Sequence, residues 1–184
     1  MGKDKISGFE NVFGSYGHDK ISGTAGANHF QTATGNDTLI GRGGNDFLVA
    51  DAGADLLNGG KGWDIFVLGD DDQRDILKYN AMNESNANPT IMLMNLDNVI
   101  QFQATGPGFD KFDFAAIDAR AGTTANETFT FRANGAFRSQ GGEIRLEVVD
   151  GSTIIYLDND NDVAAEMVIY VTGATGLTID NFIL

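Results

Sequence analysis

Cysteine is absent from the 184 residues of the chain, so disulfide bonds and thiolate metal sites are excluded. This absence does not fix the compartment, because an extracellular protein without disulfides needs another source of stability, and calcium can supply it. The length is that of one ordinary domain or two small ones and is sufficient to bury a core.

Basic residues are scarce. Lys and Arg number 12 against 26 Asp and Glu, which gives a formal net charge of −14. This balance disfavours nucleic acid and anionic membrane surfaces as partners, and cations are the natural counterpart. An excess of acid also keeps a protein soluble, but solubility makes no demand on where in the sequence the acids stand.

Long hydrophobic runs are also missing. No stretch approaches the apolar length of a transmembrane helix, so we expect no membrane insertion. The N-terminal MGKDKISGFENVF has neither an apolar core nor a small-residue cleavage site, so we do not expect it to act as a secretory signal peptide. If the protein is exported, the signal must lie elsewhere.

Glycine and aspartate, by contrast, recur with a fixed spacing. Six nonapeptide units fill residues 14–67 without a slip of register, and a degenerate seventh unit covers 5–13. The fourth place is always glycine: Gly17, Gly26, Gly35, Gly44, Gly53 and Gly62. The sixth place is acidic in all units but one: Asp19, Asn28, Asp37, Asp46, Asp55 and Asp64. The eighth is apolar: Ile21, Phe30, Leu39, Leu48, Leu57 and Phe66. A fixed short period over more than fifty residues predicts a solenoid.

Each unit is typical of a turn of about six residues followed by a strand of about three, which is too short to be stable alone. Glycine lets the turn backbone take positive φ and direct carbonyls toward one point, while the aspartate adds an anionic oxygen. Carboxylates together with carbonyls form the hard-oxygen cage that calcium prefers. Two units would complete one coil, and stacked coils would bury the eighth-place side chains against each other.

These units resemble the glycine-rich, calcium-binding nonapeptides of RTX proteins, which form a parallel β-roll. The resemblance implies that successive turns lie on alternate edges of the roll, with calcium between turns two units apart. One edge would stack Asp19, Asp37 and Asp55, and the other Asn28, Asp46 and Asp64. The turn glycines Gly35, Gly44, Gly53 and Gly62 complete the implied metal site. Four ions would fit between these pairs, and the Asp37/Asp55 and Asp46/Asp64 pairs are the strongest candidates.

The second half of the chain is predicted to be antiparallel. GEIRLEVVDGSTIIYLD alternates apolar and polar residues, turns at Asp150-Gly151 and continues as an apolar strand, which indicates a hairpin. Further strands are expected at 91–96, 98–103, 127–132, 166–171 and 177–183, with a short helix around 115–121. We therefore predict an all-β chain with a three-coil roll over 1–68, an acidic cap and linker over 69–90, and a β-sandwich over 91–184.

This half also resembles the C-terminal module of serralysin-type metalloproteases and other RTX exoproteins, through GFDKFDFAAIDA (108–119), LDNDNDVAAEMVIYVTG (157–173) and the ending LTIDNFIL. The resemblance implies a module that follows a catalytic domain, binds calcium and carries an uncleaved C-terminal signal for the type I secretion machinery. A bacterial, secreted, extracellular location follows from it. Lys78 departs from the family, which often has an acidic residue there.

Asp158, Asp160 and Asp162 have the spacing that opens an EF-hand loop. Val163, however, replaces the required glycine, and Ile169 stands where the loop needs a glutamate. A solvated turn is the favoured interpretation of this segment, with a calcium site as the alternative.

Catalysis is not expected. A zincin site needs two histidines four residues apart on a helix, whereas this chain has only His18 and His29, both inside repeats. The function favoured by the sequence is a calcium-binding RTX module that folds outside the cell. The alternative is an extracellular polysaccharide-binding module, although Arg42, Lys61 and Arg74 are too few to form a convincing basic stripe.

Overall fold

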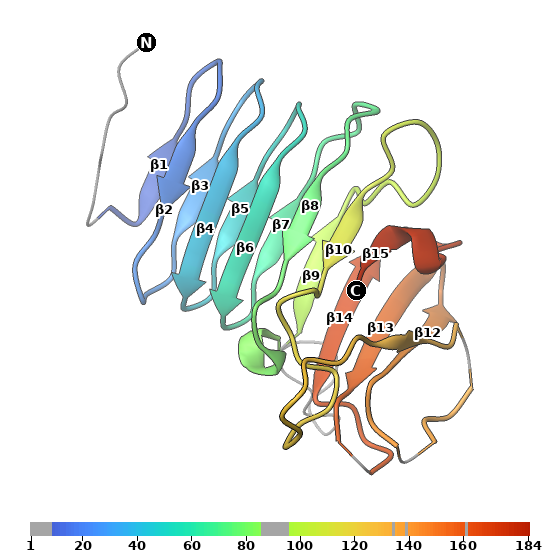
Figure 1. Cartoon of the computed structure of the whole chain (residues 1–184). Coiled ribbons are helices and arrows are strands. Elements are labelled where there is room, and N and C mark those ends of the chain that lie inside the picture. The colour runs from blue at the N-terminus through green and yellow to red at the C-terminus, as the bar shows by residue number, and fades with distance from the viewer. Residues whose placement is uncertain (1–8, 86–95, 134, 139, 161) are drawn as a thin grey trace.

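The computed structural model describes residues 9–85, 96–133, 135–138, 140–160 and 162–184. Nearly all of its regular structure is β-strand, arranged in two sheets (Figure 1). Sheet A consists, in spatial order, of β1 (Asn11–Phe13), β3 (His29–Gln31), β5 (Phe47–Val49), β7 (Ile65–Val67), β9 (Asp97–Ile100), β14 (Met167–Thr172), β13 (Ser152–Asp158), β12 (Glu143–Val149) and β11 (Thr130–Phe131). Sheet B consists of β15 (Phe182–Ile183), β10 (Lys111–Asp113), β8 (Ile76–Lys78), β6 (Leu56–Lys61), β4 (Thr38–Gly43) and β2 (Lys20–Ser22).

The nonapeptide units alternate between the two sheets, which confirms the parallel β-roll. Strands two units apart pair in parallel, as Phe30 with Leu48 in sheet A and Leu39 with Leu57 in sheet B. One coil therefore takes two units, as the sequence predicts. The same parallel pairing continues after the nine-residue period stops, because β8 pairs with β6, β9 with β7 and β10 with β8.

The core of the roll is the row of eighth-place side chains. These point between the sheets and are nearly inaccessible: Ile21, Phe30, Leu39, Leu48, Leu57 and Phe66. Leu77, Val99 and Phe112 continue the row in β8, β9 and β10. Since each coil contributes few apolar side chains, the coils are stable only as a stack.

The C-terminal part extends sheet A. β14 pairs in parallel with β9, and the antiparallel pairs β13–β14 and β12–β13 follow, so the antiparallel strands add to a sheet of the roll (Figure 1). The β12–β13 hairpin turns at Asp150 and Gly151, both with positive φ (50° and 76°), as the sequence predicts.

Other sequence expectations need correction in detail. No helix covers 115–121, which is a series of turns and bends. The strand expected at 127–132 is reduced to β11, and 177–183 divides into the 3₁₀ turn η2 (Ile179–Asn181) and β15. A second 3₁₀ turn, η1 (Met82–Glu84), follows β8. The strand expected at 91–96 lies almost wholly outside the described residues.

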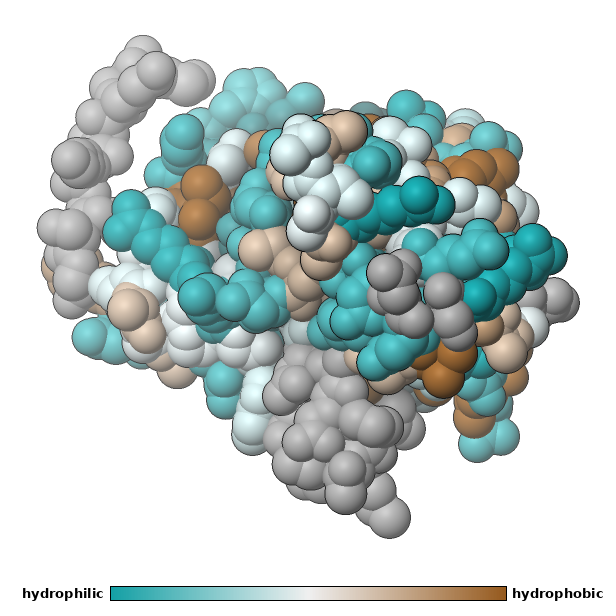
Figure 2. Space-filling model, turned by 60° about the horizontal axis from the view of Figure 1, so that its bottom comes forward, coloured by the Kyte–Doolittle hydropathy of each residue, from teal (hydrophilic) through white to brown (hydrophobic). Residues whose placement is uncertain are grey.

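Stacked phenylalanines join the roll to the C-terminal part. The rings of Phe102, Phe112, Phe114 and Phe182 lie 4.8–6.0 Å apart between centroids, which fixes β15 against β10. In the view of Figure 2, hydrophilic residues cover much of the described surface and hydrophobic residues form small separate groups. No helix in the described part of the chain is long and apolar enough to cross a membrane.

Candidate metal centre

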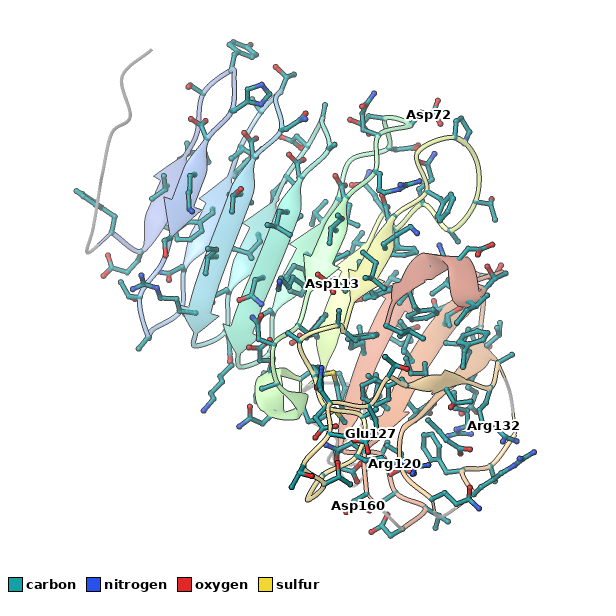
Figure 3. All side chains as sticks on the ribbon, viewed as in Figure 1. Asp72, Asp113, Arg120, Glu127, Arg132 and Asp160 are labelled. Carbon is teal, nitrogen blue, oxygen red and sulfur yellow. The ribbon has the colours of Figure 1, made fainter. Side chains whose placement is uncertain are left out.

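The turns of the roll form two edges. We call the first turn edge the one where turns lead from sheet A to sheet B (14–19, 32–37, 50–55, 68–75 and 101–110), which is uppermost in Figure 1. The second turn edge carries the turns that return to sheet A. Asp72, labelled in Figure 3, marks the first turn edge at its fourth turn.

Glycine is required where adjacent turns stack. Gly62 has φ of 141°, a conformation that side chains with a Cβ rarely adopt. A Cβ on Gly62 would also overlap the carbonyl of Gly44 in the preceding coil. The fourth-place glycine therefore permits both the turn and the close stacking of its neighbours.

The sixth-place side chains of the first turn edge form a hydrogen-bonded ladder. Asp19 N–H donates to Asp37 Oδ1 (2.7 Å), Asp37 N–H to Asp55 Oδ1 (2.6 Å), Asp55 N–H to Asp75 Oδ1 (2.9 Å) and Asp75 N–H to Asp110 Oδ1 (2.9 Å). We call this row the first ladder. Each carboxylate thus accepts the backbone N–H of the same place in the preceding coil.

The second turn edge repeats this arrangement. Asn28 N–H donates to Asp46 Oδ1 (2.7 Å), Asp46 N–H to Asp64 Oδ1 (2.8 Å) and Asp64 N–H to Asp97 Oδ1 (2.9 Å). This row is the second ladder. The structure therefore brings the sixth-place residues together in the two groups that the resemblance to RTX repeats implies, and it adds Asp75, Asp97 and Asp110.

Inside both ladders, one oxygen of each carboxylate has no protein partner. The Oδ2 atoms concerned are buried and accept no hydrogen bond from the described part of the chain: those of Asp37, Asp55 and Asp75 in the first ladder and of Asp46 and Asp64 in the second. Buried polar atoms normally have partners, and a buried unpaired carboxylate is costly. Rows of orphaned anionic oxygens are the donor set that fits a hard divalent cation such as calcium.

A comparison with protein families identifies these turns. The family model of four copies of the RTX calcium-binding nonapeptide repeat matches residues 6–39, 13–48 and 40–72. The chain carries RTX calcium-binding repeats. Its cofactor class is therefore calcium, and the carboxylates of the two ladders that fall within the matched residues are those of the RTX turns.

Other comparisons add less. A solution structure of the AlgE6R3 subunit from the Azotobacter vinelandii mannuronan C5-epimerase is similar to this chain, with 21% sequence identity and a TM-score of 0.49. The match covers 92% of this chain and 80% of that one. No curated protein matches the chain.

The pKa values of the carboxylates in the two ladders fit a site that lacks a positive charge. Burial, reinforced for Asp55 and Asp64 by neighbouring carboxylates, raises the pKa of Asp46, Asp55 and Asp64 from 3.8 to about 7. Burial and the nearby Asp110 and Asp55 raise the pKa of Asp75 to about 8. Without a cation these carboxylates are partly protonated near neutral pH. A calcium ion that binds to their oxygens would therefore also displace protons.

Each ladder ends where the protein itself satisfies both oxygens. Asp97 accepts the hydroxyl of Tyr79 on Oδ2 (3.0 Å), and Asp110 accepts the N–H of Gln103 on Oδ2 (2.7 Å). Burial and the charge of Asp64 raise the pKa of Asp97 well above its ordinary value, and Tyr79, fully buried beside it, also has a raised pKa. The ladder ends thus differ from the interior positions, where no donor of the described residues reaches Oδ2.

Asp75, Asp97 and Asp110 are the ladder members that the nine-residue period misses. They follow their predecessors by 20, 33 and 35 residues in place of 18, because more residues separate the paired strands. A signal does survive in the sequence. Each is followed two residues later by a buried apolar side chain, namely Leu77, Val99 and Phe112, as in the regular units.

The two histidines, His18 and His29, contact residues of neighbouring coils of the roll. His18 lies on the exposed surface of the first turn edge, where its Nδ1 accepts the backbone N–H of Asn36 (2.7 Å). His29 lies in β3 between the rings of Phe13 and Phe47, at centroid distances of 5.9 and 4.9 Å. Lys78, which stands where members of the resembled family often have an acidic residue, lies in β8 with its Nζ 3.8 Å from Asp113 Oδ2. The ladder position in this segment is occupied by Asp75, three residues earlier.

Proposed function

We propose that this chain is a calcium-dependent folding module of a secreted protein, whose RTX roll is completed by ions at the interior positions of the two ladders. Asp37, Asp46, Asp55 and Asp64 are the proposed carboxylate ligands from the regular repeats, and Asp75 adds one more. Asp19 and Asn28 begin the ladders, and carbonyls of the turns at Gly35, Gly44, Gly53 and Gly62 supply neutral oxygens. The observation that carries the proposal is the row of buried Oδ2 atoms without partners.

Calcium concentration then controls folding. An ion at ten times its Kd adds about 1.4 kcal/mol, and extracellular calcium modules bind with Kd of about 10⁻⁴–10⁻³ M. Several such sites add on the order of 5 kcal/mol outside the cell and almost nothing at cytosolic calcium. This difference is comparable with the whole stability of a small domain, about 5–15 kcal/mol.

The direction of the ladders favours ordering from the C-terminal side. Every ladder hydrogen bond runs from the N–H of one coil to a carboxylate of the next coil along the chain. At the C-terminal end, Tyr79 and Gln103 hold the last carboxylates without any ion. We therefore expect the last coils to order first and to serve as a template for the earlier ones.

Export is proposed to occur before this folding, through a type I channel that recognises the C-terminal end. In the folded chain, Phe182 is buried, and Asn181 Nδ2 donates to the carbonyls of Ala104 (3.0 Å) and Asp110 (3.1 Å). A signal that includes these residues would be accessible only while the chain is unfolded. A variant that lacks residues 179–184 should remain inside cells that express the secretion apparatus, and its export would contradict this part of the proposal.

The central experiment is a calcium titration followed by far-ultraviolet circular dichroism, with magnesium at equal concentration as the control. We expect β-structure to increase cooperatively with calcium but not with magnesium. Hydrogen exchange at limiting calcium should show protection in β9 and β10 before β1 to β4. A roll that is equally folded in chelator would refute calcium-dependent folding. Protection that starts at β1 would refute ordering from the C-terminal side.

A further inference from the structure

A cluster of carboxylates lies outside the roll, in the loop that joins β13 to β14. Asp158 ends β13, Asp160 lies in the loop, and Glu166 stands immediately before β14. One ligand oxygen from each lies within 4.8 Å of those of the other two. Figure 3 shows Asp160 at the lower end of the C-terminal part, away from the first turn edge marked by Asp72.

Asp158 supplies an observation independent of the clustering. Its side chain is completely buried, and its Oδ2 has no hydrogen-bond partner among the residues that the structure describes. Its Oδ1 accepts the N–H of Asp160 (3.0 Å). Among the described residues, no Lys or Arg nitrogen forms a salt bridge with Asp158, Asp160 or Glu166. A buried carboxylate that belongs to an acidic cluster is unfavourable without a cation.

The backbone leaves one oxygen of each carboxylate for a ligand. Asp160 uses Oδ1 to accept the N–H of Asp162 (2.8 Å), and Glu166 uses Oε2 to accept the N–H of Asn159 (2.9 Å). Asp158, Asp160 and Glu166 thus each keep one oxygen outside these hydrogen bonds, and the three carboxylates offer hard anionic donors without any nitrogen or sulfur ligand. Such a set suits calcium or a similar divalent ion.

We infer that Asp158, Asp160 and Glu166 form a calcium-class cation site that is separate from the RTX ladders. The sequence spacing points to Asp158, Asp160 and Asp162. In the structure, however, Glu166 and not Asp162 lies with Asp158 and Asp160. An EF-hand loop is therefore the wrong template, and the absent glycine and glutamate of that template do not count against the site.

The site connects three segments of the C-terminal part. Ala121 N–H donates to the carbonyl of Asn159 (2.7 Å), and a Cβ on Gly141 would overlap the carbonyl of Asp160. An ion held by the β13–β14 loop would therefore also fix the turns around 121 and 141. Its effect on stability should be local to this end of the molecule.

Equilibrium dialysis of the full chain against radioactive calcium tests the site. Asp158→Asn and Glu166→Gln keep the side-chain shapes and should each bind one ion fewer than the wild type. Asp162→Asn is the matched control, because Asp162 lies in the same loop, is exposed and lies outside the proposed donor set. Asp162→Asn should bind as many ions as the wild type. Glu166 is only partly buried, so its variant keeps the test valid if Asp158→Asn does not fold.

Hydrogen exchange separates this site from the ladders. Calcium should increase protection of amides in 159–166 in wild type and in Asp64→Asn, but not in Asp158→Asn. Unchanged stoichiometry and unchanged protection in both Asp158→Asn and Glu166→Gln would overturn the inference. If Asp64→Asn alone left calcium binding unchanged, the assignment of Asp64 in the ladders would fail while this site remained.

Discussion

Asp64 lies inside the second ladder. Its charge should destabilise the calcium-free protein and stabilise the calcium-bound one. Its carboxylate is fully buried, Oδ1 accepts the N–H of Asp46 (2.8 Å), and Oδ2 has no partner within the ranges that the structure describes. Asp64→Asn retains the Oδ1 acceptor and removes the charge. We predict that this substitution stabilises the calcium-free protein and destabilises the calcium-bound one.

The calcium-free gain follows from the raised pKa of Asp64, which burial shifts from 3.8 to about 7. At about 1.4 kcal/mol per pKa unit, removing the charge is worth at most about 4 kcal/mol above pH 7. An amide nitrogen without an acceptor costs about 1–3 kcal/mol, which leaves a gain of about 1–3 kcal/mol. For a chain of this size, that gain raises Tm by roughly 2–12 °C.

The calcium-bound loss follows from mass action. At about 10 mM calcium, a site with Kd of about 10⁻⁴–10⁻³ M contributes about 1.4–2.7 kcal/mol. Removing one anionic ligand abolishes most of that contribution. The increase in Tm on adding calcium should therefore be clearly smaller in Asp64→Asn than in the wild type.

Thermal unfolding in chelator and in calcium, at pH 8, measures both effects. Asp150→Asn is the control, because Asp150 is exposed in the β12–β13 turn with φ of 50°, a conformation that asparagine tolerates. It should leave both Tm values unchanged. A lower Tm for Asp64→Asn in chelator would refute the view that the buried charge is unfavourable without an ion. An unchanged calcium effect would refute Asp64 as a ligand.

Three further predictions test the same physics. Asn28→Asp restores the missing carboxylate of the second ladder, so it should lower Tm in chelator and increase the rise in Tm with calcium; a lower calcium response would contradict it. Gly62→Ala should lower the free energy of unfolding by several kcal/mol, because Gly62 has a positive φ and an added Cβ would overlap Gly44. Gly26→Ala should lower it little, because Gly26 has no positive φ and an added Cβ would have its nearest contact at 3.8 Å. Equal losses of the two variants in denaturant unfolding would refute the stacking argument. Carboxylates whose pKa is raised in the folded state stabilise the calcium-free chain at low pH, and this stability is lost as the pH rises through about 7. Thermal melts of the metal-free protein from pH 4 to 8 should therefore show a falling Tm. A Tm that rises over this pH range would contradict the raised pKa values.

The period of nine predicts the regular part of the roll well, because each unit carries its own turn and its own core residue. The inward row from Ile21 to Phe66 follows from local spacing. The alternation of edges and the stacking of Asp37 with Asp55 follow from the resemblance of the units to RTX repeats. Nothing in these features depends on distant parts of the chain. For that reason a single sequence is sufficient to derive them.

The remainder depends on contacts that spacing does not encode. Asp97 joins the second ladder across 33 residues, and Asn181 reaches the carbonyl of Asp110 across 71. The antiparallel hairpin was predictable from its alternation and its Asp-Gly turn, but its attachment to β9 through β14 was not. Likewise, only the folded loop shows that Glu166, and not Asp162, lies with Asp158 and Asp160.

The ladders indicate what sets the calcium requirement of such a roll. The chain has 26 acidic residues, yet the orphaned oxygens of the ladders occur only at interior positions, since Tyr79 and Gln103 satisfy the C-terminal members. Each additional coil would add one interior position to each edge while the ends stayed the same. The number of interior ladder positions, and not the net charge, should therefore determine how many ions a roll of this kind needs to fold.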